Sequence, residues 1–264
     1  MFPESFADLF SVAGKTALIT GGTRGIGYMI AEGYLRAGAR VYISSRKADA
    51  CQRAEQELSR LGEVHAIPAD VSEQQQCRTL VDAVADRENR LHILVNNAGA
   101  TWGAPFDEFP AAAFDKVLGL NVKAPFMLTQ LARPLLEAAA EDDNPARVIN
   151  IGSIDGLAVP VMSNFSYSAS KAAIHHLTRH LAAELAPRIL VNAIAPGPFP
   201  SKMLAPIMDT LGDQLAAASP VKRIGRPEDV AAAAVYLASP ATNFITGAVI
   251  PLDGGLSTTA AIGR

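Results

Sequence analysis

The stretch from Thr16 to Gly27 constrains the fold more than any other part of the chain. It opens with a continuous apolar run, Thr16–Thr20, and continues into the glycine-rich sequence Gly21–Gly27, which leads into a helix-periodic segment. An uninterrupted apolar run is typical of a strand that is buried on both faces of a parallel sheet. Glycines at the start of the following helix let a pyrophosphate approach backbone N–H groups and the positive helix end. The stretch therefore predicts a nucleotide site; a glycine turn that only packs the helix closely is the alternative.

Apolar runs and helix-periodic segments alternate along the rest of the chain. Helices are predicted over 47–61, over 73–87 and after Phe106. Strands are predicted over 16–20, 40–44, 64–68, 91–95, 147–151, 189–195 and 248–252. This rhythm is typical of a parallel sheet with right-handed crossovers, whose ligands bind at the carboxyl ends of the strands. Because no linker, repeat or composition shift interrupts it, we expect an α/β fold with a single domain over 1–264, of which 1–12 form an N-terminal extension.

The end of the second predicted strand bears on the kind of nucleotide. A site for NAD has a carboxylate near this point to hold the ribose 2′-hydroxyl, whereas a basic side chain accommodates the 2′-phosphate of NADP. Here Ser45 and Arg46 follow the strand, and Arg24 is also available. The sequence therefore favours NADP(H); a solvated arginine without a ligand is the alternative.

Tyr167 and Lys171 are four residues apart in a segment that we expect to be helical. Residues at this spacing share one helix face, so the ammonium would lie beside the phenol. A nearby cation favours the phenolate and lowers the tyrosine pKa from its usual value of about 10. Such a tyrosine can donate a proton to a carbonyl oxygen or accept one from an alcohol. Because the spacing is also common on exposed helices, the pair alone leaves a solvated face open.

Composition and charge argue against several classes of partner. The net charge is −3 and comes without a basic block, so neither nucleic acid nor an anionic membrane surface is expected to bind. No apolar run reaches the length of a membrane span, and the N-terminal residues lack the positive charge of a signal peptide. We therefore expect a cytoplasmic protein, in which Cys51 and Cys77 are ordinary thiols.

Five motifs follow one another along the chain. They are Thr20-Gly21-x3-Gly25-Ile26-Gly27, Asn96-Asn97-Ala98-Gly99, Asn121, Ser153 with Tyr167-x3-Lys171, and Pro196-Gly197. In order and spacing they resemble the motifs of the short-chain dehydrogenase/reductases, over residues 13–256. The resemblance implies a single Rossmann-type, doubly wound, seven-stranded parallel sheet flanked by helices. It also implies hydride transfer between a nicotinamide and a carbonyl or alcohol carbon.

The same resemblance implies roles for individual side chains. Tyr167 would be the acid/base, Lys171 would lower its pKa and bind the nicotinamide ribose, and Ser153 would orient the substrate oxygen. Asn121 would hold a water of the proton relay. Asp70 would meet the adenine, and Ser201 would lie near the nicotinamide amide. The implied cofactor-binding residues are Gly21, Thr23, Arg24, Gly25, Ile26, Gly27, Ser45, Arg46, Asp70, Val71, Asn97, Ala98, Gly99, Tyr167, Lys171, Pro196, Gly197 and Ser201.

Within this family the sequence is similar to NADPH-dependent 3-oxoacyl reductases, including the rhamnolipid-biosynthesis type, through residues 101–103, 144–152 and 196–203. The expected substrate is a hydrophobic 3-oxoacyl thioester of coenzyme A or acyl-carrier protein. Reductases of carrier-bound substrates have arginines at the positions of Met127 and Ala183, so an acidic carrier would need other basic residues, such as Lys123, Arg133 or Arg179. A general carbonyl reductase, a secondary alcohol or sugar dehydrogenase using NADP, and an NADP(H)-sensing scaffold are the alternatives.

Three further expectations concern the surroundings of the site. Residues 198–222 carry apolar side chains from Phe199 to Leu215, which predict a lid over a hydrophobic substrate or, alternatively, packing onto the core. For Trp102 there are also two alternatives: its side chain borders the pocket, or it fills the core. His176, His180 and Glu184 share one helix face, but we expect no metal, because the family's chemistry needs none and this helix lines its subunit interface. The resemblance implies a homotetramer.

Overall fold

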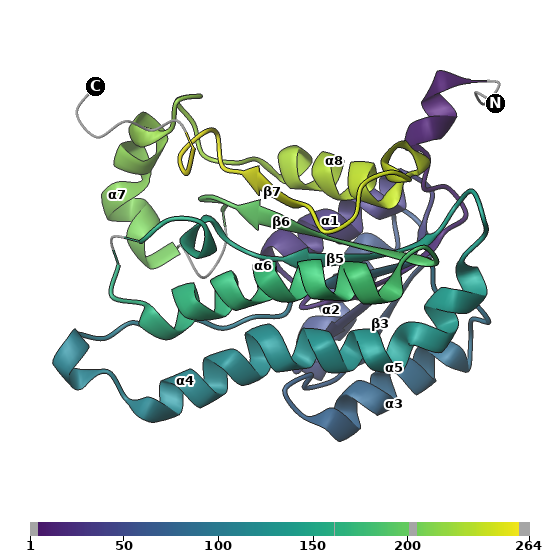
Figure 1. Cartoon of the computed structure of the whole chain (residues 1–264), viewed down its shortest axis with the longest axis horizontal. Coiled ribbons are helices and arrows are strands. Elements are labelled where there is room, and N and C mark those ends of the chain that lie inside the picture. Colours follow the sequence, from purple (N-terminus) through teal and green to yellow (C-terminus); the bar gives the residue numbers. More distant parts are fainter. Residues whose placement is uncertain (1–4, 161, 201–204, 259–264) are drawn as a thin grey trace.

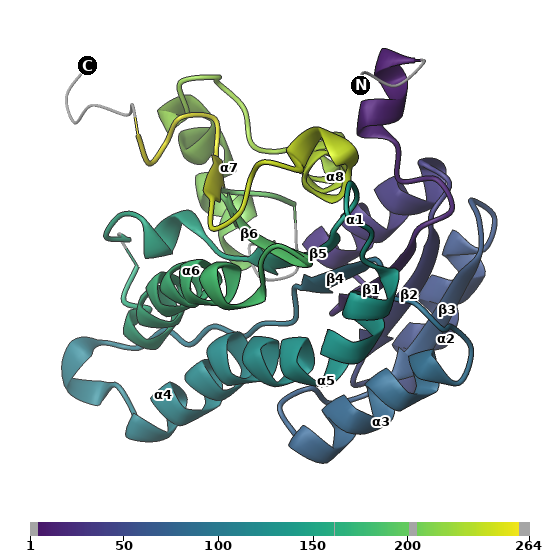
Figure 2. The same ribbon diagram turned by 45° about the vertical axis from the view of Figure 1, so that its right-hand side comes forward.

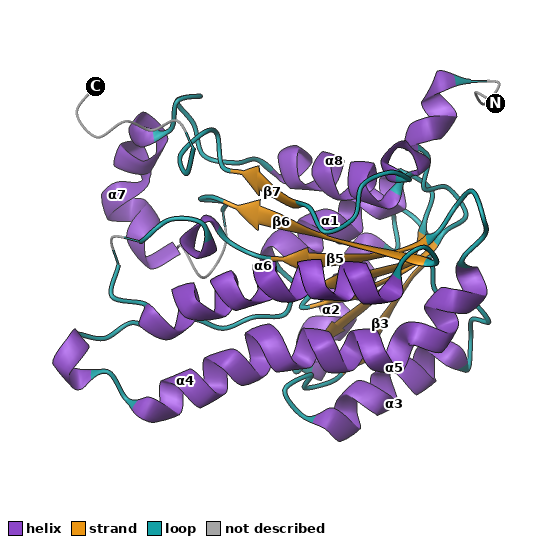
Figure 3. Ribbon diagram, viewed as in Figure 1, coloured by secondary structure: helices purple, strands orange, loops and turns teal. Residues whose placement is uncertain are grey.

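The computed structural model describes residues 5–160, 162–200 and 205–258. Within them, seven parallel strands form one sheet in the order β3-β2-β1-β4-β5-β6-β7 (Figures 1 and 3). The strands are β1 (Thr16–Thr20), β2 (Arg40–Ser45), β3 (Val64–Pro68), β4 (Ile93–Asn96), β5 (Ala146–Ile151), β6 (Ile189–Pro196) and β7 (Val249–Leu252). Strands β1, β2 and β3 follow one another toward one edge of the sheet, and β4, β5, β6 and β7 follow one another toward the other edge. The connections on the two sides therefore run in opposite directions from the point between β1 and β4. A crevice opens at such a point beyond the carboxyl ends of the strands.

Helices cover both faces of the sheet (Figure 2). Side chains of α1 (Gly25–Arg36), α2 (Ala48–Leu58) and α8 (Pro227–Ala238) join one buried apolar cluster. Side chains of α3 (Gln74–Ala85), α5 (Ala124–Ala139) and α6 (Phe165–Leu185) join a second cluster on the opposite face. The expected α/β fold, a doubly wound parallel sheet flanked by helices, is confirmed.

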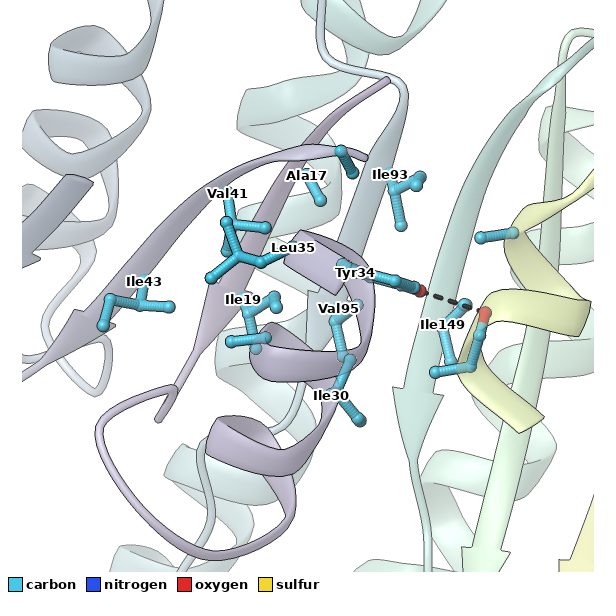
Figure 4. Close-up of a cluster of buried hydrophobic side chains, with 14 of the residues drawn as sticks. Ala17, Ile19, Ile30, Tyr34, Leu35, Val41, Ile43, Ile93, Val95 and Ile149 are labelled. Carbon is cyan, nitrogen blue, oxygen red and sulfur yellow. Dashed lines mark hydrogen bonds between the residues drawn. The ribbon is translucent and has the colours of Figure 1, made fainter. Parts of the chain in front are cut away.

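Alternation along β1 shows why the strand is apolar throughout. Ala17 and Ile19 pack in the cluster with α1, whereas Leu18 packs in the cluster on the other face. Figure 4 shows the first of these clusters, in which the Tyr34 hydroxyl donates a hydrogen bond of 3.1 Å to the Ala234 carbonyl oxygen of α8. A strand with both faces buried needs apolar side chains at every position, as the sequence of β1 predicts.

The helix predicted after Phe106 is interrupted around Asn121. It consists of α4 (Ala111–Leu118), a π-helical turn over Gly119–Lys123, and α5. The predicted fourth strand also differs slightly, since β4 begins at Ile93 rather than at residue 91. The Leu91 N–H donates to the Leu135 carbonyl oxygen of α5, so this residue belongs to the preceding connection.

Two buried cations lie at the amino end of the sheet. Lys15, just before β1, donates to the Asn144 side-chain oxygen at 3.1 Å and to the Ala238 carbonyl oxygen at 2.9 Å. Arg147, in β5, is only 1% exposed. Its guanidinium donates to four acceptors, which are the carbonyl oxygens of Pro145, Ala146 and Ser239 and the Asn243 side-chain oxygen. Burial lowers the pKa of Lys15 to about 8, with a second contribution from the positive charge of Arg147.

The N-terminal segment packs beside this amino end. A 3-10 helix spans Phe6–Phe10, and the Phe10 ring stacks on Tyr236 of α8 with a centroid distance of 6.3 Å. The remaining helix, α7 (Ala205–Ala218), lies at the other end of the molecule (Figure 1).

Candidate active site

A cleft of about 980 Å³ runs along the carboxyl ends of the strands. Nearly all the residues predicted to bind cofactor or substrate line it, from the glycine-rich loop at one end to Ser153, Tyr167 and Lys171 at the other. Three predicted residues do not line the cleft. Gly27 lies beneath the loop, Asn121 lies behind the catalytic residues, and Ser201 lies outside the described residues.

The glycine-rich loop brings backbone close to backbone. Gly21 has a positive φ of 66°, a conformation that favours glycine. A Cβ on Gly27 would lie 2.4 Å from the Asn97 side-chain nitrogen and 2.5 Å from the Gly21 carbonyl oxygen. Side chains larger than hydrogen would therefore force the loop and the start of α1 apart. The resulting cradle, with N–H groups at a helix start, fits the pyrophosphate of a dinucleotide.

Thr20 and Asn97 hold this loop against β4. The Thr20 hydroxyl accepts hydrogen bonds from the backbone N–H groups of Asn97 and Ala98, at 3.0 and 3.1 Å. The Asn97 side-chain nitrogen donates to the carbonyl oxygens of Thr20 and Gly21, at 2.8 and 3.1 Å. Asn97 thus shapes the cradle, in addition to being one of the residues predicted to bind the cofactor.

The far end of the cleft carries positive charge without a carboxylate at the end of β2. Arg46 is largely exposed, and its guanidinium lies 3.9 Å from an Asp70 carboxylate oxygen. The other Asp70 oxygen accepts from the Ser72 N–H and hydroxyl, at 3.0 and 2.7 Å. Arg24 lines the same end. Mobile cations at this position fit a 2′-phosphate, as the sequence predicts.

Ser153, Tyr167 and Lys171 meet at the opposite end. Ser153 follows β5, while Tyr167 and Lys171 lie on successive turns of α6. The Ser153 hydroxyl lies close enough to the Tyr167 hydroxyl to lower its pKa, and it accepts a hydrogen bond from the Asp155 N–H at 3.2 Å. The Lys171 ammonium donates to the Ile151 carbonyl oxygen at 2.7 Å and lies 5.4 Å from the centre of the Tyr167 ring. The helical pairing predicted from the four-residue spacing is therefore present, and both side chains face a cleft rather than solvent.

The electrostatics differ from the expectation of a lowered tyrosine pKa. Burial raises the pKa of Tyr167 to about 12. The nearby Ser153 hydroxyl opposes this effect, and the Asp155 carboxylate adds to it. Burial also lowers the pKa of Lys171 to about 8, and Asp155 opposes that shift. Loss of water therefore outweighs the neighbouring charges in this site. Near neutral pH the phenol holds its proton and the ammonium keeps its charge.

Asn121 is held by the protein through both ends of its amide. Its side-chain oxygen accepts from the Ala100 N–H at 2.8 Å, and its nitrogen donates to the Ala100 carbonyl oxygen and to the Ser170 hydroxyl, each at 2.9 Å. Both amide hydrogens are thus used within the protein. A relay water at this place would have to form its hydrogen bond with the backbone of the π-helical turn, where regular helix bonding is interrupted.

Sequence reasoning missed two polar side chains beside the catalytic residues. Asp155 lies two residues after Ser153, and Asn164 lies three residues before Tyr167; both line the cleft. A signal was available, because each falls within a few residues of a predicted catalytic side chain. Polar residues are so common in loops that this proximity alone did not single them out.

The surroundings of the site settle some alternatives. Phe199 is buried in the core cluster with α1 and also borders the cleft, and Leu215 lines the cleft. Of the predicted lid, Met203 and Leu204 lie outside the described residues.

Trp102 neither lines the cleft nor fills the core. Its side chain is 39% exposed, and the Lys116 ammonium lies 5.6 Å from the centre of its ring. Among the described residues, no three His, Cys, Asp or Glu side chains group as metal ligands, and no helix is long and apolar enough to cross a membrane.

The parallel sheet, the glycine cradle and the tyrosine–lysine pair together define a nucleotide-binding α/β oxidoreductase. A family model described as enoyl-(acyl carrier protein) reductase matches residues 21–257. The chain belongs to the short-chain dehydrogenase/reductase family, as its motifs indicate.

Individual relatives refine this assignment. The rhamnolipids biosynthesis 3-oxoacyl-[acyl-carrier-protein] reductase of Pseudomonas aeruginosa is 49% identical over 249 residues, which cover 93% of this chain and 97% of that protein. The 7alpha-hydroxysteroid dehydrogenase of Escherichia coli is 34% identical, covering 94% and 96% of the two chains. A solved Pseudomonas aeruginosa RhlG/NADP active-site complex superposes with a TM-score of 0.92 at 47% identity, covering 95% and 99%. The expectations of an NADP(H)-dependent family member and of a 3-oxoacyl reductase type agree with these relatives.

Proposed function

We propose that the chain is an NADPH-dependent reductase of hydrophobic 3-oxoacyl thioesters. The observation that carries the proposal is one continuous cleft, with Arg24 and Arg46 among the residues at its nucleotide end and the hydroxyls of Ser153 and Tyr167 at its other end. Similarity to the 3-oxoacyl reductase of Pseudomonas aeruginosa supports the choice of substrate.

The chain's residues fit the cofactor along the whole cleft. The cradle of Gly21 and Gly27 would hold the pyrophosphate, and Arg24 with Arg46 would hold the 2′-phosphate. Asp70 and Val71 would border the adenine, and Lys171 would reach the nicotinamide ribose. NADPH, when bound, supplies the hydride that reduces the keto carbon.

The catalytic residues act on the oxygen of the same carbonyl. As the carbon is reduced, negative charge grows on this oxygen, and the hydroxyls of Ser153 and Tyr167 can both donate to it. Donors aimed at developing charge stabilise the transition state more than the ground state. Tyr167 then gives its proton to the oxygen, and the buried Lys171 ammonium stabilises the phenolate that remains. The raised pKa keeps the Tyr167 phenol protonated near neutral pH, which is the form that a proton donor needs in the direction of reduction.

The carrier, the lid and the assembly belong to the same proposal. Lys123, Arg133 and Arg179 are exposed, and Arg133 is paired with Glu137 at 2.7 Å, which leaves Lys123 and Arg179 as the better contacts for an acidic carrier. Residues 198–222 would cover the substrate. A cytoplasmic homotetramer is the assembly that family resemblance supports, and light scattering tests its subunit number.

The test is the consumption of NADPH or NADH by purified protein with a short 3-oxoacyl thioester. Faster loss of NADPH than of NADH, dependent on the thioester, is the expected result. Thioesters of coenzyme A and of acyl-carrier protein, compared at equal concentration, identify the carrier. Turnover of simple ketones without turnover of thioesters would instead indicate a general carbonyl reductase. NADPH binding without turnover in either direction would favour a nucleotide-sensing protein.

A further inference from the structure

Asp155 and Asn164 join the two segments that carry the catalytic hydroxyls. Asp155 lies in the 3-10 turn Ile154–Gly156, directly after Ser153, and Asn164 precedes the first turn of α6. The Asn164 side-chain nitrogen donates to the Oδ2 atom of Asp155 at 2.9 Å. The Asn164 carbonyl oxygen accepts from the Tyr167 N–H at 2.8 Å. This pair, the Asp155–Asn164 pair, therefore lies beside the position of the reacting carbonyl.

Two acceptor atoms of the pair lack a donor within the described residues. Asn164 is 5% exposed, and its side-chain oxygen is buried without a hydrogen-bond partner. The orientation of the amide follows from chemistry, because an ionised carboxylate only accepts and the nitrogen must therefore face Asp155. The Oδ1 atom of Asp155 also receives no hydrogen bond from these residues. An unpaired buried acceptor destabilises a protein, so an acceptor retained in a cleft points to a ligand that supplies the donor.

The charged groups around the pair do not supply the missing hydrogen-bond donors. Lys171 and Tyr167 of α6 are the titratable groups that interact electrostatically with Asp155. The Lys171 ammonium donates to the Ile151 carbonyl oxygen, and the Tyr167 hydroxyl lies beside Ser153. The half-buried carboxylate has a raised pKa because burial outweighs the opposing effects of Asn164 and Lys171. Two donors for a carbonyl oxygen thus lie beside a carboxylate oxygen at the cleft and a buried amide oxygen, neither of which receives a hydrogen bond from the described residues.

We infer that the Asp155–Asn164 pair is a subsite for a hydrogen-bond donor of the substrate, an N–H or O–H group within a few bonds of the reduced carbonyl. The amide N–H of a pantetheine-like thiol arm and the hydroxyl of a hydroxyketone share this chemistry. The inference rests on the proposed function, since that function places the reacting carbonyl at Ser153 and Tyr167. It makes the pair determinants of specificity.

Matched substrates test the subsite. The 3-oxobutanoyl thioester of N-acetylcysteamine is compared with its isostere in which the amide N–H is replaced by an ester oxygen, and 4-hydroxy-2-butanone is compared with 2-pentanone. We expect kcat/KM to favour the donor-bearing member by about 10-fold to 100-fold, the range for a hydrogen bond to a charged group. The two thioesters test whether the subsite binds an amide N–H, and the two ketones test whether it binds a hydroxyl group.

Variants assign the preference to the pair. In Asp155→Ala and Asn164→Ala the preference falls toward one, mainly through KM of the donor-bearing substrate, and in Asp155→Asn it falls part of the way. Asp107→Ala, which removes an exposed carboxylate outside the cleft, keeps the wild-type preference. Equal losses of kcat on both members of a substrate pair, with the preference unchanged, would overturn the subsite and leave only a structural role.

Binding gives a readout that does not depend on turnover. Calorimetry with the enzyme saturated with NADPH, which cannot oxidise an alcohol, measures the affinities of the two matching 3-hydroxybutanoyl thioesters, and the amide-bearing one should bind about 10-fold more tightly. If no thioester is reduced, the proposed function fails, while calorimetry and the ketone pair still report on the subsite. Equal affinities and equal kcat/KM values within each pair would overturn the subsite even if thioesters are reduced.

Discussion

The two ends of the sheet both bury cations, but they use them differently. At the amino end, Lys15 and Arg147 direct six hydrogen bonds at carbonyl and amide oxygens of the protein. At the carboxyl end, Lys171 makes one hydrogen bond, to Ile151, and faces a cleft. Hydrogen bonds from the protein offset the cost of a buried charge whose donors are matched, whereas a charge that faces a cleft with few partners is available for chemistry. Substitutions at the two ends should therefore affect different properties.

The largest expected effect is on catalysis by Tyr167. Tyr167→Phe removes the proton donor and one of two hydroxyls at the carbonyl oxygen, so kcat should fall by about 10³-fold. Steady-state assays with NADPH measure it. Tyr34→Phe is the matched control, because it removes a hydroxyl whose partner is the Ala234 carbonyl oxygen at the interface of α1 and α8. It should leave kcat unchanged, and full activity of Tyr167→Phe would remove Tyr167 from the mechanism.

Exchanging the two buried cations sharpens the contrast. Arg147→Met leaves at least three buried acceptors without their donor and should lower the free energy of unfolding by about 3 kcal/mol, with kcat of the folded enzyme unchanged. Lys171→Met should show the opposite pattern, a large loss of kcat with little loss of stability. Urea unfolding and activity assays of both variants give the two values. A stable Arg147→Met, or an active Lys171→Met, would break the distinction between the two ends.

Lys15 should make stability depend on pH. Its pKa is lowered from 10.5 to about 8 in the folded protein, so above pH 8 the unfolded state binds more protons than the folded state. Above pH 10.5 the side chain is neutral in both states, and burying it carries no cost of charge. As the pH falls toward 8, the unfolded state takes up the proton first, and the free energy of unfolding decreases. The stability of wild type relative to Lys15→Met should therefore rise by about 2 kcal/mol between pH 8 and pH 10. Unfolding curves at both pH values measure this change, and a constant difference would contradict the lowered pKa.

The smallest expected effect concerns an exposed cation at the carboxyl end. Arg46→Ser removes a charge proposed to meet the 2′-phosphate, so the preference for NADPH over NADH in kcat/KM should fall by about 10-fold. Arg53→Ser is a suitable control, because Arg53 also lines the cleft but is paired with Asp49 at 2.9 Å. An unchanged preference in Arg46→Ser would move recognition of the phosphate to Arg24.

Most of the fold and much of the site could be predicted because their signals are local. Apolar runs such as Thr16–Thr20 correspond to strands buried on both faces, and Gly21 and Gly27 occupy positions where a larger side chain would clash. Burial of charge could not be predicted in this way. Arg147 stands at the start of a strand, where a charged residue ordinarily faces water, and only contacts from distant Ser239 and Asn243 enclose it.

The pKa of Tyr167 and the role of Asn121 depended on the same kind of information. The four-residue spacing gives the neighbour of Tyr167, but its desolvation comes from the whole cleft. The sequence predicts a helix around Asn121, but the π-helical turn that presents this residue to Ala100 and Ser170 lies where α4 and the turn itself pack against α6, a tertiary contact.

The π-helical turn at Gly119–Lys123 also limits the length of this part of the chain. A turn closed by bonds to the fifth residue accommodates one residue more than regular α-helical winding. The segment 111–139 therefore carries a residue that a continuous helix would not need, and Asn121 reaches Ala100 and Ser170 because of it. Deletion of a single residue here would restore a regular helix and remove the geometry by which Asn121 reaches both Ala100 and Ser170. Insertions and deletions should thus be tolerated in the loops around the sheet far better than in this apparently simple helix.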